Sequence, residues 1–193
     1  MNNTPISNAL ALRATASAFD AQRGKLPVPG DPHRAPDSVT VARQISELGK
    51  MITALGDEVL FRTAAQDRDA HTARVITSFA AAVGPAGEAA SALGSVAHQL
   101  SFLDQTDHLR DQPDALDVRE AATLVVIDTL DMADTALREA ADSLHAASAT
   151  VSPPPVRLQA ARSRSTTAAS SPAPPLATAP TAAAPPTRIA RVR

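Results

Sequence analysis

Acidic side chains recur at short intervals between residues 104 and 142, and they are the residues best placed to do chemistry. Calcium and magnesium favour several oxygen ligands, so this run supports a metal-dependent or small-ligand enzyme as one alternative. It lacks the alternating Asp and Asn positions with a central Gly that a helix–loop–helix calcium loop requires. The sequence therefore favours a solvated acidic surface over a metal site. The run comprises Asp104, Asp107, Asp111, Asp114, Asp117, Glu120, Asp128, Asp131, Asp134, Glu139 and Asp142, with His108 among them.

Histidine and hydroxyl groups form no catalytic pattern in this sequence. The five His residues stand at none of the spacings that would place two imidazoles on one helix face around zinc. The chain has no Cys, which removes disulfides, thiolate metal sites and cysteine nucleophiles. It also has no Gly-x-Ser-x-Gly turn, phosphate loop or dinucleotide fingerprint, so we expect a non-enzymatic protein without a cofactor. The His residues are His33, His71, His98, His108 and His145.

Charge is divided unevenly along the chain. Residues 1–37 carry a net charge of +1, residues 38–150 carry -9, and residues 151–193 carry +6 with no acidic side chain. This asymmetry predicts an acidic body with a basic arm. Flexible arginines can contact phosphates of nucleic acid without reading its sequence, or can contact an acidic protein. The basic arm is therefore expected to bind an anionic partner through Arg157, Arg162, Arg164, Arg188, Arg191 and Arg193.

Composition narrows the function classes further. The chain has no Trp, no Tyr and four Phe, so a base-stacking surface for single-stranded nucleic acid is poorly supplied. We find neither a secretory signal nor a run of eighteen uncharged apolar residues, so we expect a cytoplasmic protein with no membrane contact. Sixteen Arg against two Lys, with abundant Ala and Pro, suggest the genome of a GC-rich bacterium. An accessory protein of a bacterial plasmid or phage is a further alternative.

The elements that must position these residues are helical. Apolar residues recur at alternating spacings of three and four, which predicts an all-α domain over residues 38–150. We expect a three-helix bundle or helical hairpin with coiled-coil-like heptad packing. Its helices are predicted at about 38–65, 68–103 and 114–148, with a kink near 84–87 because of Pro85. Asp37 or Ser38 is expected to cap the first of them.

Two flanking segments are expected to lie outside this bundle. Residues 1–37 read as a flexible N-terminal arm, with a possible short helix over 5–20 followed by a Pro/Gly linker. Residues 151–193 hold nine of the sixteen Pro residues and read as a disordered Pro/Ala/Arg-rich tail.

The first helix of the predicted bundle carries a heptad seam that is flanked by two Gly residues seven positions apart. One interpretation is a surface for self-association or for a helical protein partner. The other, favoured because short apolar stripes usually face their own core, is close packing of a helix of the same bundle. The leading functional hypothesis is a non-enzymatic helical interaction or scaffold protein that self-associates. Its packing face would be Val41, Ile45, Leu48, Gly49, Ile52, Leu55, Gly56 and Val59.

Overall fold

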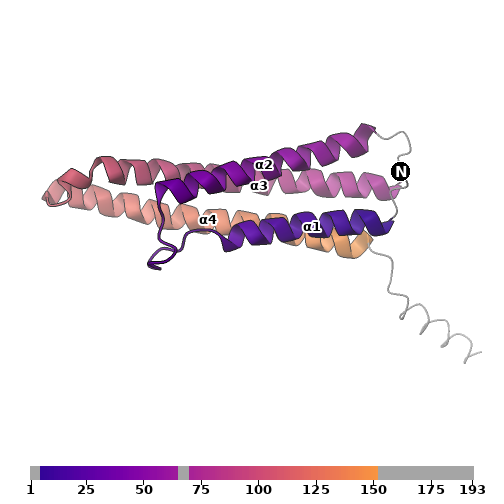
Figure 1. Cartoon of the computed structure of the whole chain (residues 1–193), viewed down its shortest axis with the longest axis horizontal. Helices are drawn as coiled ribbons and strands as arrows, with labels where there is room; N and C mark the ends of the chain where they lie inside the picture. The colour runs from indigo at the N-terminus through magenta and orange to yellow at the C-terminus, as the bar shows by residue number, and fades with distance from the viewer. Residues whose placement is uncertain (1–4, 65–69, 152–193) are drawn as a thin grey trace, which may run out of the picture. The chain divides into compact units, whose positions relative to one another are not determined.

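The computed structural model describes residues 5–64 and 70–151. Within these ranges the chain forms four α-helices and one short 3-10 helix, with no strand (Figure 1). The prediction of an all-α fold is confirmed. None of the described helices is both long enough and apolar enough to cross a membrane. The elements are α1 (Pro5–Gly24), α2 (Ser38–Ala64), α3 (Ala70–Gln105), η1 (Asp107–Leu109) and α4 (Pro113–Val151).

Local sequence signals explain where the helices begin. Asp37 caps α2, because its Oδ1 accepts the backbone N–H of Thr40 at 2.9 Å. Pro113 opens α4 at a position where a helix needs no N–H donor. The segment between α1 and α2 reverses at Pro29 and Gly30, and Gly30 takes a φ of 85° that this turn requires. Of the two candidate caps for α2, the structure selects Asp37.

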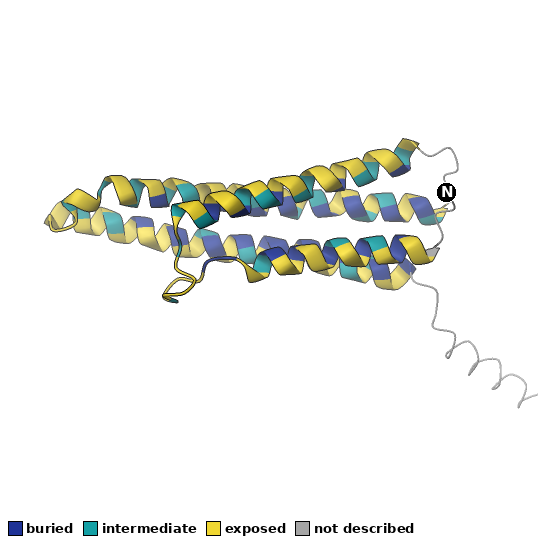
Figure 2. Ribbon diagram, in the orientation of Figure 1, coloured by how far each residue is buried: buried dark blue, intermediate teal, exposed yellow. Residues whose placement is uncertain are grey.

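The centre of the bundle is the pair α3 and α4, which share the most extensive packing. Figure 2 shows buried residues alternating with exposed ones along both helices, as expected for helices with one inward face. Much of that inward face is alanine, and small side chains let two helix axes approach closely. The buried alanines include Ala82, Ala86 and Ala89 of α3 and Ala133, Ala136, Ala140 and Ala141 of α4.

The N-terminal segment differs from its expected role as a flexible arm. Residues 5–24 form α1, which packs lengthwise on α4 and contributes Leu12 and Phe19, both fully buried, to the common core. Ser148 of α4 fixes this contact by donating a hydrogen bond from Oγ to the backbone oxygen of Ala9 at 2.9 Å. The described bundle therefore has four helices rather than three. A helix of only 20 residues becomes stable when it buries a face against neighbours.

The predicted second helix runs without interruption through Pro85 as part of α3. Gly84 directly precedes the proline and has no Cβ to clash with the proline Cδ, which eases the helical conformation at this point. The six tail arginines lie outside the described residues, as does the segment 65–69, which contains the predicted boundary between the first and second helices. Val151, placed in the tail by the sequence, is instead the buried last residue of α4.

Candidate interaction groove

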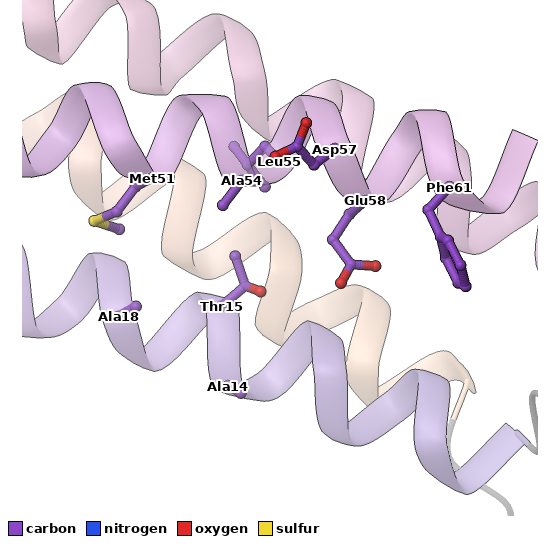
Figure 3. A pocket seen from close by; sticks show the side chains of 9 residues that line it. All are labelled: Ala14, Thr15, Ala18, Met51, Ala54, Leu55, Asp57, Glu58 and Phe61. Atoms are coloured by element: carbon purple, nitrogen blue, oxygen red, sulfur yellow. The ribbon is translucent and has the colours of Figure 1, made fainter.

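A groove runs between α1 and α2 on one side of the bundle. The two helices each pack on an inner helix, α1 on α4 and α2 on α3, and they make little contact with each other. The two helices run antiparallel. The start of α1 lies beside the end of α2, and the end of α1 lies beside the start of α2. The space between them measures about 500 Å³ (Figure 3). It is lined by Ala14, Thr15, Ala18, Met51, Ala54, Leu55, Asp57, Glu58 and Phe61.

One end of the groove is closed by a buried arginine. Arg62 of α2 donates from Nη1 to Oδ1 of Asn8 on α1 at 2.5 Å and from Nε to Oε2 of Glu58 at 2.9 Å. The guanidinium also lies 5.2 Å from the ring centre of Phe79, a distance at which cations are attracted to an aromatic face. A buried charge needs such partners, because burial removes it from water. We call this group the Arg62 clamp.

The other end is closed by two glutamines. Gln22 of α1 donates from Nε2 to the backbone oxygen of Gln44 at 3.3 Å, and Gln44 donates in return to the backbone oxygen of Lys25. Lys25 also pairs with Glu47 of α2 at 2.8 Å. The hydrogen bond from Lys25 holds the pKa of Glu47 below its usual range. We call this group the Gln22–Gln44 clamp.

The floor and walls of the groove between the clamps are apolar. Leu55 is buried at the floor, while Ala14 and Ala18 of α1 and Ala54 of α2 are exposed along the walls. Phe61 is 67% exposed at the end near the Arg62 clamp. Small alanine side chains on both walls leave room for an apolar side chain that enters from outside.

The groove lining carries one carboxylate without a cationic partner. It includes Asp57 and Glu58 and no Lys or Arg, and Glu58 is paired with Arg62. Figure 3 shows the carboxylate of Glu58 pointing into the space between the helices, where Thr15 of α1 points back toward α2. Asp57 is exposed at the rim and has no ion-pair partner among the described residues. A binding partner that places a cationic side chain near Asp57 is therefore favoured over a partner that places an acidic side chain there.

The carboxylates that the sequence offered as metal ligands do not converge. Among the described residues, no three His, Asp or Glu side chains gather closely enough to hold a metal ion. Asp107 pairs instead with Arg119 at 3.5 Å, and Asp134 pairs with Arg23 of α1 at 3.0 Å. The remaining members are spread over the end of α3, the loop before α4 and the solvent side of α4, as a solvated acidic surface would be.

The histidines are equally dispersed. His33, His98 and His108 are exposed, and His145 lies 2.9 Å from Oδ2 of Asp20, where it links α4 to α1. His71, at the start of α3, has a buried Nε2 without a partner among the described residues.

The predicted packing face on α2 is divided by the fold. Val41, Leu48 and Leu55 are buried in the core, and the alternate seam positions pack partly against that core. The three buried residues are therefore not a free surface for a partner, which corrects the first interpretation of the seam at those positions. The predicted packing face comprises Val41, Ile45, Leu48, Gly49, Ile52, Leu55, Gly56 and Val59.

The glycines correct the second interpretation. Gly49 and Gly56 are exposed, and a Cβ added to either would meet no heavy atom of the described structure within 4 Å. No helix of this bundle packs closely against them. The seam packs internally, as expected, but its flanking glycines take no part in that contact.

The sequence interpretation missed the groove because it assigned α1 to an arm outside the bundle. One signal was present: α1 carries large apolar residues on its outer side, Ile6 and Leu10, as well as on its inner side, Leu12 and Phe19. Comparison of the chain with protein-family models, curated proteins and solved structures gave no match. The geometry of the groove is therefore the basis for a functional proposal.

Proposed function

We propose that this protein is a non-enzymatic interaction protein that binds an amphipathic helix in the groove between α1 and α2. The observation that carries the proposal is that α1 and α2 meet at two polar clamps and leave an apolar groove between them. Helix-in-groove recognition uses a hydrophobic trough of this kind, with anchors at positions i, i+3, i+4 and i+7 of the bound helix.

The length of the groove fits a helix of about three turns. Its lining on α2 runs from Met51 to Phe61, ten residues apart, which corresponds to about 15 Å along a helix. A bound helix of that length presents several anchors in successive turns. The clamps hold α1 and α2 in place, so the protein need not rearrange to receive it.

Two side chains suit the groove to a helical partner. Phe61 offers an exposed aromatic ring at one end, and aromatic residues are enriched among the contacts that dominate binding energy. Met51 lines the wall with a flexible thioether that can adapt to different anchor shapes. The basic tail, which lies outside the described residues, is proposed separately as a contact for an anionic partner.

Site-specific photo-cross-linking tests the proposed function. A photoreactive amino acid is placed at Ala54 in the groove wall, and a matched variant carries it at Leu124, which is 55% exposed on α4. After irradiation in the producing cells, we expect an adduct at position 54 whose cross-linked peptide is helical, and little at position 124. An adduct with any protein helix supports the proposal, whichever protein supplies it. Equal yields at the two positions would contradict it.

A further inference from the structure

We propose that the helix bound in the groove is α1 of a second copy of this chain. The inference rests on the proposed function and names the partner of the same site. In a two-fold dimer the α1 helix of each copy would lie in the groove of the other, so every contact would occur twice.

The outer side of α1 has the character of an anchor helix. Ile6 is 59% exposed and Leu10 is 57% exposed, on the side of α1 that faces away from the core. Exposed alanines at 14, 18 and 21 continue this surface toward the end of the helix. These positions recur at spacings of three and four, as the anchors of a helix in a groove must. Nothing within the described bundle covers this surface.

The charges of α1 and the groove are complementary. Arg13 is the one charged residue in the first half of α1, and it is exposed with no ion-pair partner among the described residues. Asp57 at the groove rim is likewise exposed and unpaired in the described structure. The unpaired guanidinium of Arg13 and the unpaired carboxylate of Asp57 are matched in sign.

The register of such a complex brings these charges together. The groove lining on α2 runs from Met51 to Phe61, so Asp57 stands one residue from its centre, about 1.5 Å along the axis. Arg13 lies near the middle of the exposed stretch from Ile6 to position 21. When α1 is centred in the groove, Arg13 therefore lies within about one helical turn of Asp57, whichever direction the bound helix runs.

The surface suits a weak, reversible contact. The exposed stretch of α1 from Ile6 to position 21 is about 22 Å long, and a face two helices wide, about 20 Å, then gives roughly 450 Å² on each copy and 900 Å² in total. This area lies below that of stable interfaces and in the range of weak, transient ones. We therefore expect a dimer whose population rises with protein concentration.

A charge exchange followed by sedimentation velocity tests the proposal. Arg13→Glu and Asp57→Arg are made singly and together in the full chain, and the dimer dissociation constant of each is measured. We expect each single reversal to raise the constant by about tenfold or more, and the double variant to return to within about threefold of the unmodified chain. A dissociation constant that returns in the double variant indicates that the side chains at positions 13 and 57 pair directly.

A second pair of variants gives the control. Leu10→Asp should abolish the dimer, whereas Leu124→Asp, at nearly the same exposure on α4, should leave it intact. Circular dichroism establishes whether each variant is folded. If Leu10→Asp does not fold, the exchange of Arg13 and Asp57 tests the dimer on its own. A chain that is monomeric at every concentration, charge reversals without effect, or loss of the dimer in Leu124→Asp would each overturn the proposal. An adduct between position 54 and a different protein would leave the proposed function standing while overturning this inference.

Discussion

Arg62 near the end of α2 donates a hydrogen bond to the side-chain oxygen of Asn8 near the start of α1, across 54 residues of sequence. The Gln22–Gln44 clamp joins the opposite ends of the same two helices. Between the clamps α1 and α2 are separated by the apolar groove. The two polar contacts thus fix the spacing of the helices, while the packing of each on α3 or α4 supplies the apolar burial.

Removal of the Arg62 side chain should destabilise the bundle. Arg62→Ala leaves the oxygen of Asn8 buried without its donor and removes a buried stem that packs near Phe79. We expect the free energy of unfolding, measured in urea, to fall by about 2–3 kcal/mol. Arg74→Ala is the control, since Arg74 is exposed on α3, and it should change stability by less than about 0.5 kcal/mol. Equal losses in the two variants would contradict the clamp.

Shortening a buried side chain of the α2 seam should lower the stability of the bundle. Leu48 is fully buried, so Leu48→Ala should lower the free energy of unfolding by about 2–5 kcal/mol. Leu60→Ala, on the same helix at 69% exposure, should cost less than about 0.5 kcal/mol. If Leu48→Ala dissociated an oligomer but left the stability of the folded chain unchanged, the seam would be an external interface.

The two glycines of α2 should be replaceable. Because a Cβ at Gly49 or Gly56 meets open space, Gly→Ala at either position should raise the free energy of unfolding by roughly 0.5–1 kcal/mol. The gain arises from the lower conformational entropy that alanine has in the unfolded chain. A loss of stability, or a loss of the dimer, would show that a helix of another molecule packs directly on these glycines.

The cap of α2 should make stability depend on acid pH. Hydrogen bonds from Thr40, side chain first, hold the pKa of Asp37 below its ordinary value of 3.8. A carboxyl group whose pKa is lowered by folding stabilises the folded state above its unfolded pKa, and this contribution is lost as pH falls through the folded value. The melting temperature of the unmodified chain should exceed that of Asp37→Asn at neutral pH, and the gap should close below about pH 4. A gap that does not change with pH would contradict the charged cap.

Much of the bundle was accessible from the sequence because periodicity reports helices directly. The predicted helix over 114–148 appears as Pro113–Val151, because a long helical pattern identifies the element and leaves only its ends open. Periodicity cannot say what an apolar stripe faces. Val41 and Leu48 face the core, whereas Ile6 and Leu10 face outward, although both pairs have helical spacing.

The groove was beyond sequence reasoning for a related reason. Alanine lines both the close contact of α3 with α4 and the open walls at Ala14 and Ala54, so its presence does not distinguish packing from exposure. The clamp between Asn8 and Arg62 joins distant segments, and nothing in either local sequence indicates the other. Pro and Gly between α1 and α2 suggested a loose arm, but they form a turn that returns the chain to the bundle.

The most direct test of the groove as a binding surface is the alkylation rate of a single cysteine in a chain that otherwise has none. Ala54→Cys places a thiol in the groove wall, and Leu124→Cys places one on α4 as the control. We predict that both thiols react rapidly in dilute protein, and that only the thiol at position 54 becomes slow as protein concentration rises. A thiol at position 54 that is protected even in dilute protein would show that the groove is closed. A rate at position 54 that stays equal to that at position 124 at every concentration would show that no second copy occupies it.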